Sequence, residues 1–218
     1  MSNSDYEVVD RTYGQFCGLA RALDLVGERW ALLVVRELLF GPRRFTDLLD
    51  GLPGVSTNVL ATRLRQLERA GLVRRDVLPP PAASAVYELT DHGRALEPAV
   101  AALGRWGAAS LGPRRPEQVL RSHWLLLALK AFFRAEAADG LERVYELRLR
   151  EGAFRVVVAD GLLEVGAPNG AGADLVLEAD DDALVAVLAG QLEPAALTVV
   201  DGDPAELPRF VELFRFAA

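Results

Sequence analysis

The sequence predicts a mixed α and β protein (α+β) built from two modules. Three observations support this prediction. The length of 218 residues exceeds an average domain of roughly 100–200 residues. The apolar spacing is mostly helical before residue 112 and becomes strand-like after residue 144. Two prolines and a glycine interrupt the helical pattern at 111–116. We therefore predict domains at 1–112 and 117–218.

Composition and charge narrow the class of protein. With 51% hydrophobic residues the chain can bury a sizeable core, which excludes a disordered protein. Residues 1–112 carry 13 arginines and 13 acidic residues, so the whole net charge of −7 belongs to the remainder. Arginines are densest between Arg29 and Arg75. This asymmetry predicts two modules with different partners, and the net charge does not exclude a nucleic acid as one of them.

The cellular compartment is predicted from what the sequence lacks. Cys17 is the single cysteine, which excludes an internal disulfide and suits a reducing compartment. The longest apolar run, 183–189, is far shorter than the ~20 residues that cross a bilayer. Residues 1–5 are polar and acidic and show no signal-peptide pattern. We expect a cytoplasmic protein without a membrane partner.

The first module is predicted to begin with helices and to continue into a hairpin. Apolar residues at helical spacing indicate helices that end at glycine or proline, and short apolar runs indicate strands. The predicted elements are helices at 20–26, 30–39 and 45–49, a helix capped by Ser56 and stopped by Gly71, strands at 72–78 and 85–89 joined by 79–84, and a long helix from Thr90. This order is that of a winged helix-turn-helix.

Four segments of this module resemble HxlR-type regulators of the wider MarR-like group. They are FCGLARALDLVGERW at 16–30, RELLFGPRRF at 36–45, LATRLRQLERAGLV at 60–73 and YELTDHG at 87–93. The resemblance implies a homodimeric transcription factor that places the helix after Ser56 in the major groove of an operator in double-stranded DNA. Some members of the family sense oxidants through a cysteine at the position of Cys17.

The residues of the helix after Ser56 support this interpretation independently. Leu60, Leu64 and Leu67 share one face, and the opposite face carries side chains that can read base edges or contact phosphates. The helix N-terminus suits a phosphate. The predicted DNA-binding residues are Arg43, Arg44, Ser56, Thr57, Asn58, Thr62, Arg63, Arg65, Gln66, Arg69 and Arg75. The alternative is a solvated face on which the arginines of the helix pair with Glu68.

Two features of the module leave alternatives open. Residues 79–84 contain no Arg or Lys, and Arg74 and Arg75 alternate along a strand, so only one of them can face a phosphate. Cys17 precedes Arg21 by one helical turn, and a nearby positive charge or a helix N-terminus lowers a thiol pKa. The alternative for Cys17 is a buried, inert thiol.

The second module is predicted to hold a helix followed by a strand meander. The elements are a helix from 120 that ends near 139–140, strands at 145–150, 154–158, 162–165 and 173–178, a helix at 180–188, a strand at 197–200 and a helix at 203–214. This order resembles the sterol-carrier-protein-like fold, which implies an apolar tunnel for a hydrophobic effector. The candidate effector residues are Trp124, Leu127, Phe132, Phe154, Phe210 and Phe214. Alternatively these side chains fill a core, or the module adds a dimerisation surface.

Signals of catalysis are absent from the sequence. It contains no phosphate-binding glycine loop, dinucleotide turn or nucleophile elbow. His92, His123 and Cys17 have no metal-ligand spacing, and the carboxylates at 180–182 diverge on a helix. We expect no enzyme, catalytic residue, cofactor or metal, and predict a DNA-binding repressor modulated by a hydrophobic small molecule. The alternatives are a lipid carrier or scaffold whose helix-turn-helix binds protein, and a redox-sensing regulator that acts through Cys17.

Overall fold

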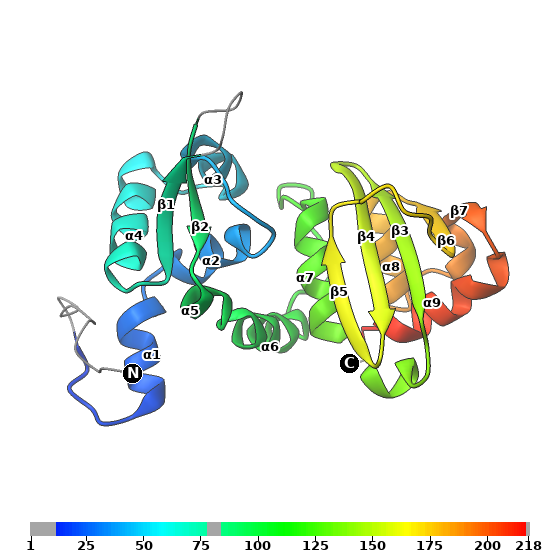
Figure 1. The fold of residues 1–218 in the computed structure, drawn as a ribbon, viewed down its shortest axis with the longest axis horizontal. Helices are drawn as coiled ribbons and strands as arrows, with labels where there is room; N and C mark the ends of the chain where they lie inside the picture. The colour runs from blue at the N-terminus through cyan, green and yellow to red at the C-terminus, as the bar shows by residue number, and fades with distance from the viewer. Residues whose placement is uncertain (1–11, 78–83, 217–218) are drawn as a thin grey trace. The chain divides into compact units, whose positions relative to one another are not determined.

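The computed structural model describes residues 12–77 and 84–216, and it divides into two compact units, Met1–Val100 and Ala101–Ala218 (Figure 1). The division falls inside a helix, whereas the sequence places the domain boundary in the proline-containing segment 112–116. The assignment of separate roles to 1–112 and 117–218 stays a prediction.

Unit 1 contains four helices, a two-stranded hairpin and further helix beyond it. The elements are α1 (Gly18–Val26), α2 (Ala31–Leu38), α3 (Phe45–Gly51), α4 (Thr57–Arg69), β1 (Val73–Val77), β2 (Ala85–Leu89), α5 (Asp91–Arg94) and the start of α6 (Glu97–Ala108). Leu38, Leu48, Leu60, Leu64 and Leu67 are fully buried and form the centre of its core. The predicted helix-turn-helix and wing strands are therefore present.

The helix predicted from Thr90 is wrong in one respect, because it forms as two helices, α5 and α6. Thr90 does cap the first of them, and its Oγ1 accepts the Gly93 N–H at 3.1 Å. Pro98 has no N–H, and inside a continuous helix its ring would clash with the carbonyl of Arg94. The loop part of the predicted wing at 78–83 lies outside the described residues.

Unit 2 is a five-stranded sheet with helices. Its elements are α7 (Ser122–Phe132), β3 (Arg143–Leu149), β4 (Gly152–Ala159), β5 (Leu162–Gly166), β6 (Leu175–Glu178), α8 (Asp181–Leu188), β7 (Thr198–Gly202) and α9 (Leu207–Phe214), with short 3-10 turns at Ala135–Ala138, Pro194–Ala196 and Pro204–Glu206. The strand order is β5-β4-β3-β6-β7. The first three strands form the predicted antiparallel meander, β6 pairs parallel with β3, and β7 pairs antiparallel with β6.

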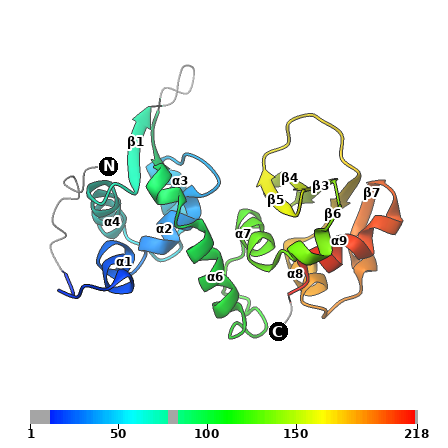
Figure 2. The same cartoon turned by 60° about the horizontal axis from the view of Figure 1, so that its bottom comes forward.

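The core of unit 2 lies between the sheet and its helices. Figures 1 and 2 show α7, α8 and α9 on the same face of the sheet. Tyr145 and Leu147 of β3 are completely or almost completely buried there, as are Phe210 and Phe214 of α9. The opposite face carries Glu146 and other residues that are less buried. The sheet thus has one apolar side, as alternation along an antiparallel strand predicts.

Candidate nucleic-acid interface

Helix α4 presents a polar face and buries an apolar one, as the sequence predicts. Its leucine stripe packs into unit 1, and the predicted base-reading side chains of Asn58, Thr62, Arg65 and Arg69 are exposed. Ser56 is the N-cap residue, and its Oγ accepts the Val59 N–H at 3.4 Å. Serine caps by satisfying a backbone N–H group that the first turn leaves without a partner. The exposed first turn also contains Thr57.

Arg63 departs from the predicted face. It is 9% exposed, its guanidinium donates to Gln66 Oε1, and it lies 3.3 Å from Glu28 Oε2. The helical wheel places Arg63 between the apolar and polar faces, so its position depends on the tertiary neighbour Glu28. The side chains of Arg63 and Gln66 are thus engaged within unit 1, whereas Arg65 points to solvent and donates from Nη2 to Thr62 Oγ1 at 3.1 Å.

Arg43 and Arg44 lie immediately before α3, and backbone contacts hold both of them in place. The Arg43 N–H donates to the Tyr87 carbonyl at 2.9 Å, and the Tyr87 N–H donates to the Arg43 carbonyl at 2.8 Å. Asp47 Oδ2 accepts the Arg44 N–H at 3.0 Å. These bonds fix the backbone from which the exposed Arg44 side chain and the half-buried Arg43 side chain project. The start of α3 is therefore joined to strand β2 of the wing.

The two arginines of strand β1 are distinguished by their pairing. Arg74 Nε lies 2.7 Å from Glu88 Oε1 on the neighbouring strand. Arg75 lies opposite Tyr87, so it projects from the other face of the hairpin. Within the described part of the chain, Arg75 is exposed and has no ion-pair partner. The structure therefore leaves Arg75, and not Arg74, available for a phosphate.

Cys17 lies at the N-terminus of α1, where the sequence places a candidate redox residue. The thiol is exposed, which contradicts the alternative of a buried thiol. The backbone N–H groups of Ala20 and Leu19, in the first turn of the helix, lower the pKa of Cys17. Arg21, the expected source of positive charge, lies 3.8 Å from Asp24 instead. The lowered pKa thus comes from the helix N-terminus.

The six candidate effector residues of unit 2 differ in their burial and in their neighbours. Phe210 and Phe214 are fully buried, with ring centroids 5.1 Å apart, and the Tyr145 ring lies 5.2 Å from Phe210. Phe132 packs against Phe216, with a centroid separation of 4.5 Å. Trp124 and Phe154 are half-buried and Leu127 is buried. Phe210 and Phe214 thus fill the core, and the effector-binding role of the six residues stays a prediction.

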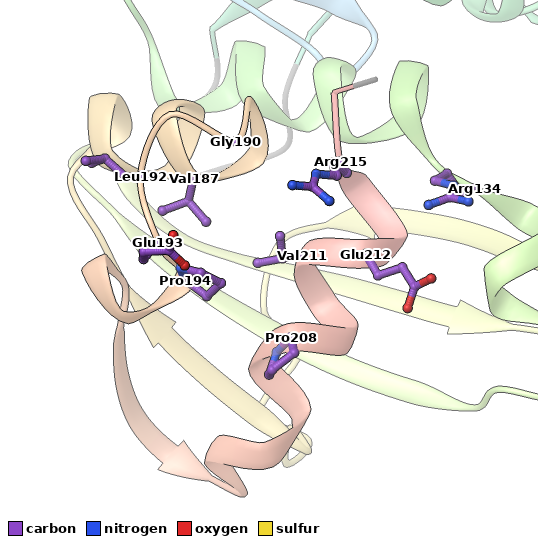
Figure 3. A pocket seen from close by; sticks show the side chains of 10 residues that line it. All are labelled: Arg134, Val187, Gly190, Leu192, Glu193, Pro194, Pro208, Val211, Glu212 and Arg215. Carbon is purple, nitrogen blue, oxygen red and sulfur yellow. The ribbon is translucent and has the colours of Figure 1, made fainter. Parts of the chain in front are cut away.

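A surface depression of about 390 Å³ lies between α8 and α9 (Figure 3). It is lined by Arg134, Val187, Gly190, Leu192, Glu193, Pro194, Pro208, Val211, Glu212 and Arg215. None of the candidate effector residues belongs to this set. Sequence patterns could not have found the depression, because its walls come from three separate segments with no shared motif.

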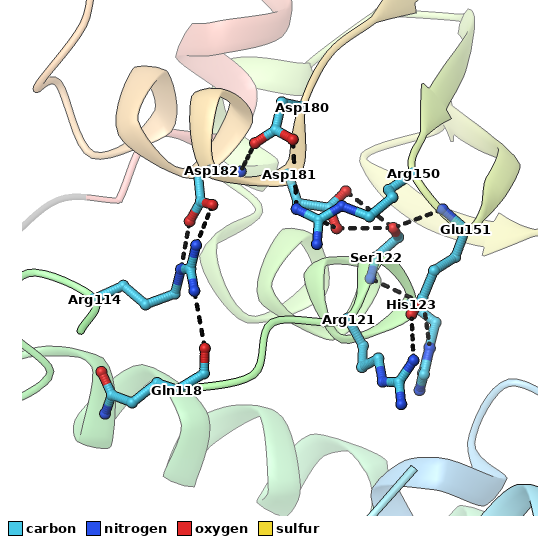
Figure 4. A network of polar contacts seen from close by, with 10 residues as sticks. All are labelled: Arg114, Gln118, Arg121, Ser122, His123, Arg150, Glu151, Asp180, Asp181 and Asp182. Atoms are coloured by element: carbon cyan, nitrogen blue, oxygen red, sulfur yellow. Dashed lines mark hydrogen bonds and ion pairs between the residues drawn. The ribbon is translucent and has the colours of Figure 1, made fainter. Parts of the chain in front are cut away.

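A polar network surrounds the N-terminus of α8 (Figure 4). Ser122 and Asp181 are completely buried, and the Ser122 hydroxyl lies 2.9 Å from Asp181 Oδ1. The same hydroxyl accepts the Glu151 N–H at 3.1 Å. Nearby, Arg114 Nε donates to Asp182 Oδ1 at 2.6 Å. The carboxylates at 180–182 thus bind side chains and backbone of the protein itself.

Two classes of site are not found among the residues described. No group of three or more His, Cys, Asp or Glu side chains in 12–77 and 84–216 could hold a metal ion. In the same residues, no helix is long and apolar enough to cross a membrane. The polar face of α4 with its flanking arginines therefore remains the strongest candidate site in unit 1.

The fold and this face together define a winged helix-turn-helix of the DNA-binding class. The model of the family described as HxlR-like helix-turn-helix matches residues 25–115. An uncharacterized HTH-type transcriptional regulator of Synechocystis is 43% identical over 95 residues, which span 44% of this chain and 70% of that protein. The uncharacterized HTH-type transcriptional regulator YvaP of Bacillus subtilis is 39% identical over 93 residues, which span 43% of this chain and 86% of that protein. The chain belongs to the HxlR-like family of transcriptional regulators.

Solved structures are also similar in sequence to the same region. One of them is the reduced form of the transcriptional regulator YodB from Bacillus subtilis, with 32% identity and a TM-score of 0.40. The match covers 46% of this chain and all of that one. The family model ends at residue 115, so most of unit 2 lies beyond it.

Proposed function

We propose that the protein is a sequence-specific repressor that places α4 in the major groove of operator DNA and acts in the cytoplasm as a homodimer. The observation that carries the proposal is the exposed face of α4 with Asn58, Thr62, Arg65 and Arg69. Asn reads adenine and Arg reads guanine through paired hydrogen bonds, and Thr contacts either polar edges or a thymine methyl group. The capped N-terminus of the helix and the outlying arginines contact phosphates, which position the protein on the duplex.

The test separates base reading from phosphate binding. Full-length protein selects a duplex from a randomised library, and affinity is then measured for that duplex and for a scrambled one. Arg65→Ala lowers the ratio of the two affinities about tenfold, because a bidentate base contact contributes about 1–3 kcal/mol of discrimination. Arg44→Ala weakens both duplexes equally and reduces the salt slope by about one.

Arg209→Gln on α9 is the matched control, because it removes the same charge from unit 2. Equal small effects of Arg65→Ala and Arg44→Ala contradict the proposed roles. If the native chain binds no duplex even at low salt, the protein-binding scaffold or lipid carrier becomes the favoured alternative. Binding that falls steeply with salt contradicts that alternative, since counterion release is characteristic of DNA binding.

Dimer formation is supported by an apolar stripe on α1. Leu19 and Leu23 are exposed, and their spacing of four residues places them on one side of the helix, while Phe16, two residues before the helix, is exposed as well. An exposed apolar stripe of this size on a helix is typical of a protein–protein interface. A second copy of this chain is the proposed partner, because paired recognition helices read the two half-sites of an operator.

Unit 2 is proposed to be a sterol-carrier-protein-like effector domain that binds a hydrophobic small molecule. The support is its topology, in which an antiparallel meander is followed by a strand parallel to the first one and by an antiparallel edge strand. The ligand alters DNA binding only if it binds two conformations with unequal affinity. Native mass spectrometry of freshly purified protein tests this role through co-purified apolar molecules.

Redox sensing through Cys17 is a second candidate function, and the exposed thiol at the start of α1 favours it. The thiolate is the reactive form, so the lowered pKa of Cys17 shifts alkylation toward lower pH. The rate of reaction with iodoacetamide, measured against pH, is expected to rise at lower pH than for free cysteine. Because Cys17 is the only cysteine, Cys17→Ser serves as the blank. A midpoint at or above that of free cysteine contradicts the role.

A further inference from the structure

The depression between α8 and α9 has a mixed polar and apolar lining and lies outside the aromatic core. Its apolar lining residues are Val187, Leu192, Pro194, Pro208 and Val211. Its volume of about 390 Å³ falls within the roughly 300–1,000 Å³ of small-molecule sites. Val211 is buried and Leu192 is half exposed, so the apolar surface continues from the core to the rim. The depression can therefore hold a small apolar group.

Arg215 supplies a cation that forms no ion pair with any described residue. Among the residues described, its guanidinium has neither an ion pair nor a side-chain hydrogen bond. Figure 3 shows this side chain projecting from the end of α9 toward Gly190 and Val187. By contrast, Arg134 at the far side of the depression lies 3.4 Å from Glu136. Arg215 is thus the better-placed group for an external anion.

The backbone around Arg215 is fixed, which limits where its guanidinium can reach. The Phe216 N–H donates to the Leu188 carbonyl at 2.8 Å, so the chain after α9 is tied to the end of α8. Gly190 has φ +70°, and a Cβ there would lie 3.5 Å from Arg215 Nη2. Glycine thus follows α8 in a left-handed backbone conformation, and the guanidinium lies close beside it.

Two carboxylates also line the depression, and their negative charge opposes the binding of an anionic ligand. Glu212 extends from α9 on the side away from Val187 and Leu192 (Figure 3). Glu193 is exposed on the segment before Pro194. Arginine offers a planar pair of donors that matches a carboxylate in two parallel hydrogen bonds. The geometry therefore favours an anionic group beside Arg215.

We propose that this depression binds a small apolar carboxylate, with Arg215 holding the carboxylate and the wall of Val187, Leu192 and Val211 holding the apolar part. The inference rests on the proposed effector role of unit 2 and assigns it a ligand class and a place. It also moves the expected site from the aromatic side chains of the core to the surface between α8 and α9.

Calorimetry on the full chain without DNA tests the site with phenylbutyrate, phenylbutanol and phenylbutylamine. These probes share one apolar body and differ in charge. Phenylbutyrate is expected to bind at least about tenfold more tightly than the other two, a difference that corresponds to about 1.4 kcal/mol. Arg215→Gln removes that preference, whereas Arg209→Gln, on the same helix but paired with Glu206, retains it. Leu192→Ser weakens all three probes by a similar factor.

Three outcomes overturn the proposal: no saturable binding of phenylbutyrate, tighter binding of phenylbutylamine, or equal effects of Arg215→Gln and Arg209→Gln. Circular dichroism of each variant shows whether it is folded. Because no DNA is present, failure of this test leaves the DNA-binding function intact. Conversely, if the chain binds phenylbutyrate but no DNA duplex, the result supports the carboxylate site and contradicts the proposed DNA-binding function.

Discussion

Tyr145 shows how a single buried group can oppose folding. Its ring packs against Phe210, but its hydroxyl is completely buried and has no hydrogen-bond partner among the described residues. A buried hydroxyl without a partner costs about 1–3 kcal/mol. Burial, with a smaller effect from the charge of Glu206, raises the pKa of Tyr145 to about 12. The aromatic ring therefore stabilises the core, while the hydroxyl destabilises it.

Tyr145→Phe is expected to increase the free energy of unfolding by about 1 kcal/mol, because it removes the buried hydroxyl and keeps the ring. Urea denaturation followed by fluorescence measures the change, with Tyr87→Phe in unit 1 as the control. A loss of stability contradicts the assignment.

The native protein also loses stability as pH rises from 10.0 toward about 12, since the unfolded tyrosine ionises first. Tyr145→Phe lacks this loss.

The contrast between Arg63 and Arg65 marks the limit of prediction at single residues. Both arginines are on α4, and both belong to the predicted DNA-binding set. Arg65 is exposed, whereas Arg63 is buried beside Glu28, which comes from a distant part of the sequence. The apolar period of a helix identifies its buried and exposed faces. Whether a residue at the border between the faces is buried depends on tertiary contacts, which the period does not specify.

At the scale of elements, the start of α7 and the start of α8 are held together by one buried hydrogen bond. Ser122 and Asp181 are completely buried, and the Ser122 hydroxyl also accepts the Glu151 N–H. A buried carboxylate is tolerated only when donors surround it. The pair therefore ties the two helices and the turn after β3 into one unit.

Ser122→Ala is expected to lower the free energy of unfolding by about 2 kcal/mol, because Asp181 loses a buried donor and the Glu151 N–H loses its acceptor. Chemical denaturation measures the difference. Ser110→Ala, at an exposed position, is the control and should change stability by less than about 0.5 kcal/mol. Equal effects of the two substitutions contradict the structural role of the Ser122 hydroxyl.

Element boundaries were predictable where local chemistry marks them. Ser56 and Gly71 bracket α4, and Thr90 begins α5, as the sequence predicts. The break between α5 and α6 was missed because the apolar spacing continues across it. Pro98 was the available signal, since proline removes a backbone donor and clashes with the preceding turn.

At the scale of the whole molecule, the proposed dimer predicts that Leu19→Asp combined with Leu23→Asp yields a monomer. Both side chains are exposed on α1, and placing two charges in an apolar interface opposes association. Sedimentation equilibrium should show half the native mass, and affinity for the selected duplex should fall at least about tenfold. Leu162→Asp, on exposed β5 of unit 2, is the control. A monomeric native chain contradicts the prediction.

The sequence alone determined most elements of both units, the polar and apolar faces of α4, and the family, because these follow from local periods, caps and short motifs. The tertiary structure decided which polar groups are engaged and where a cavity lies. Arg74 pairs with Glu88, leaving Arg75 available, and Arg215 faces a depression built from three segments. Such pairings depend on contacts between residues far apart in sequence, which a local pattern does not specify.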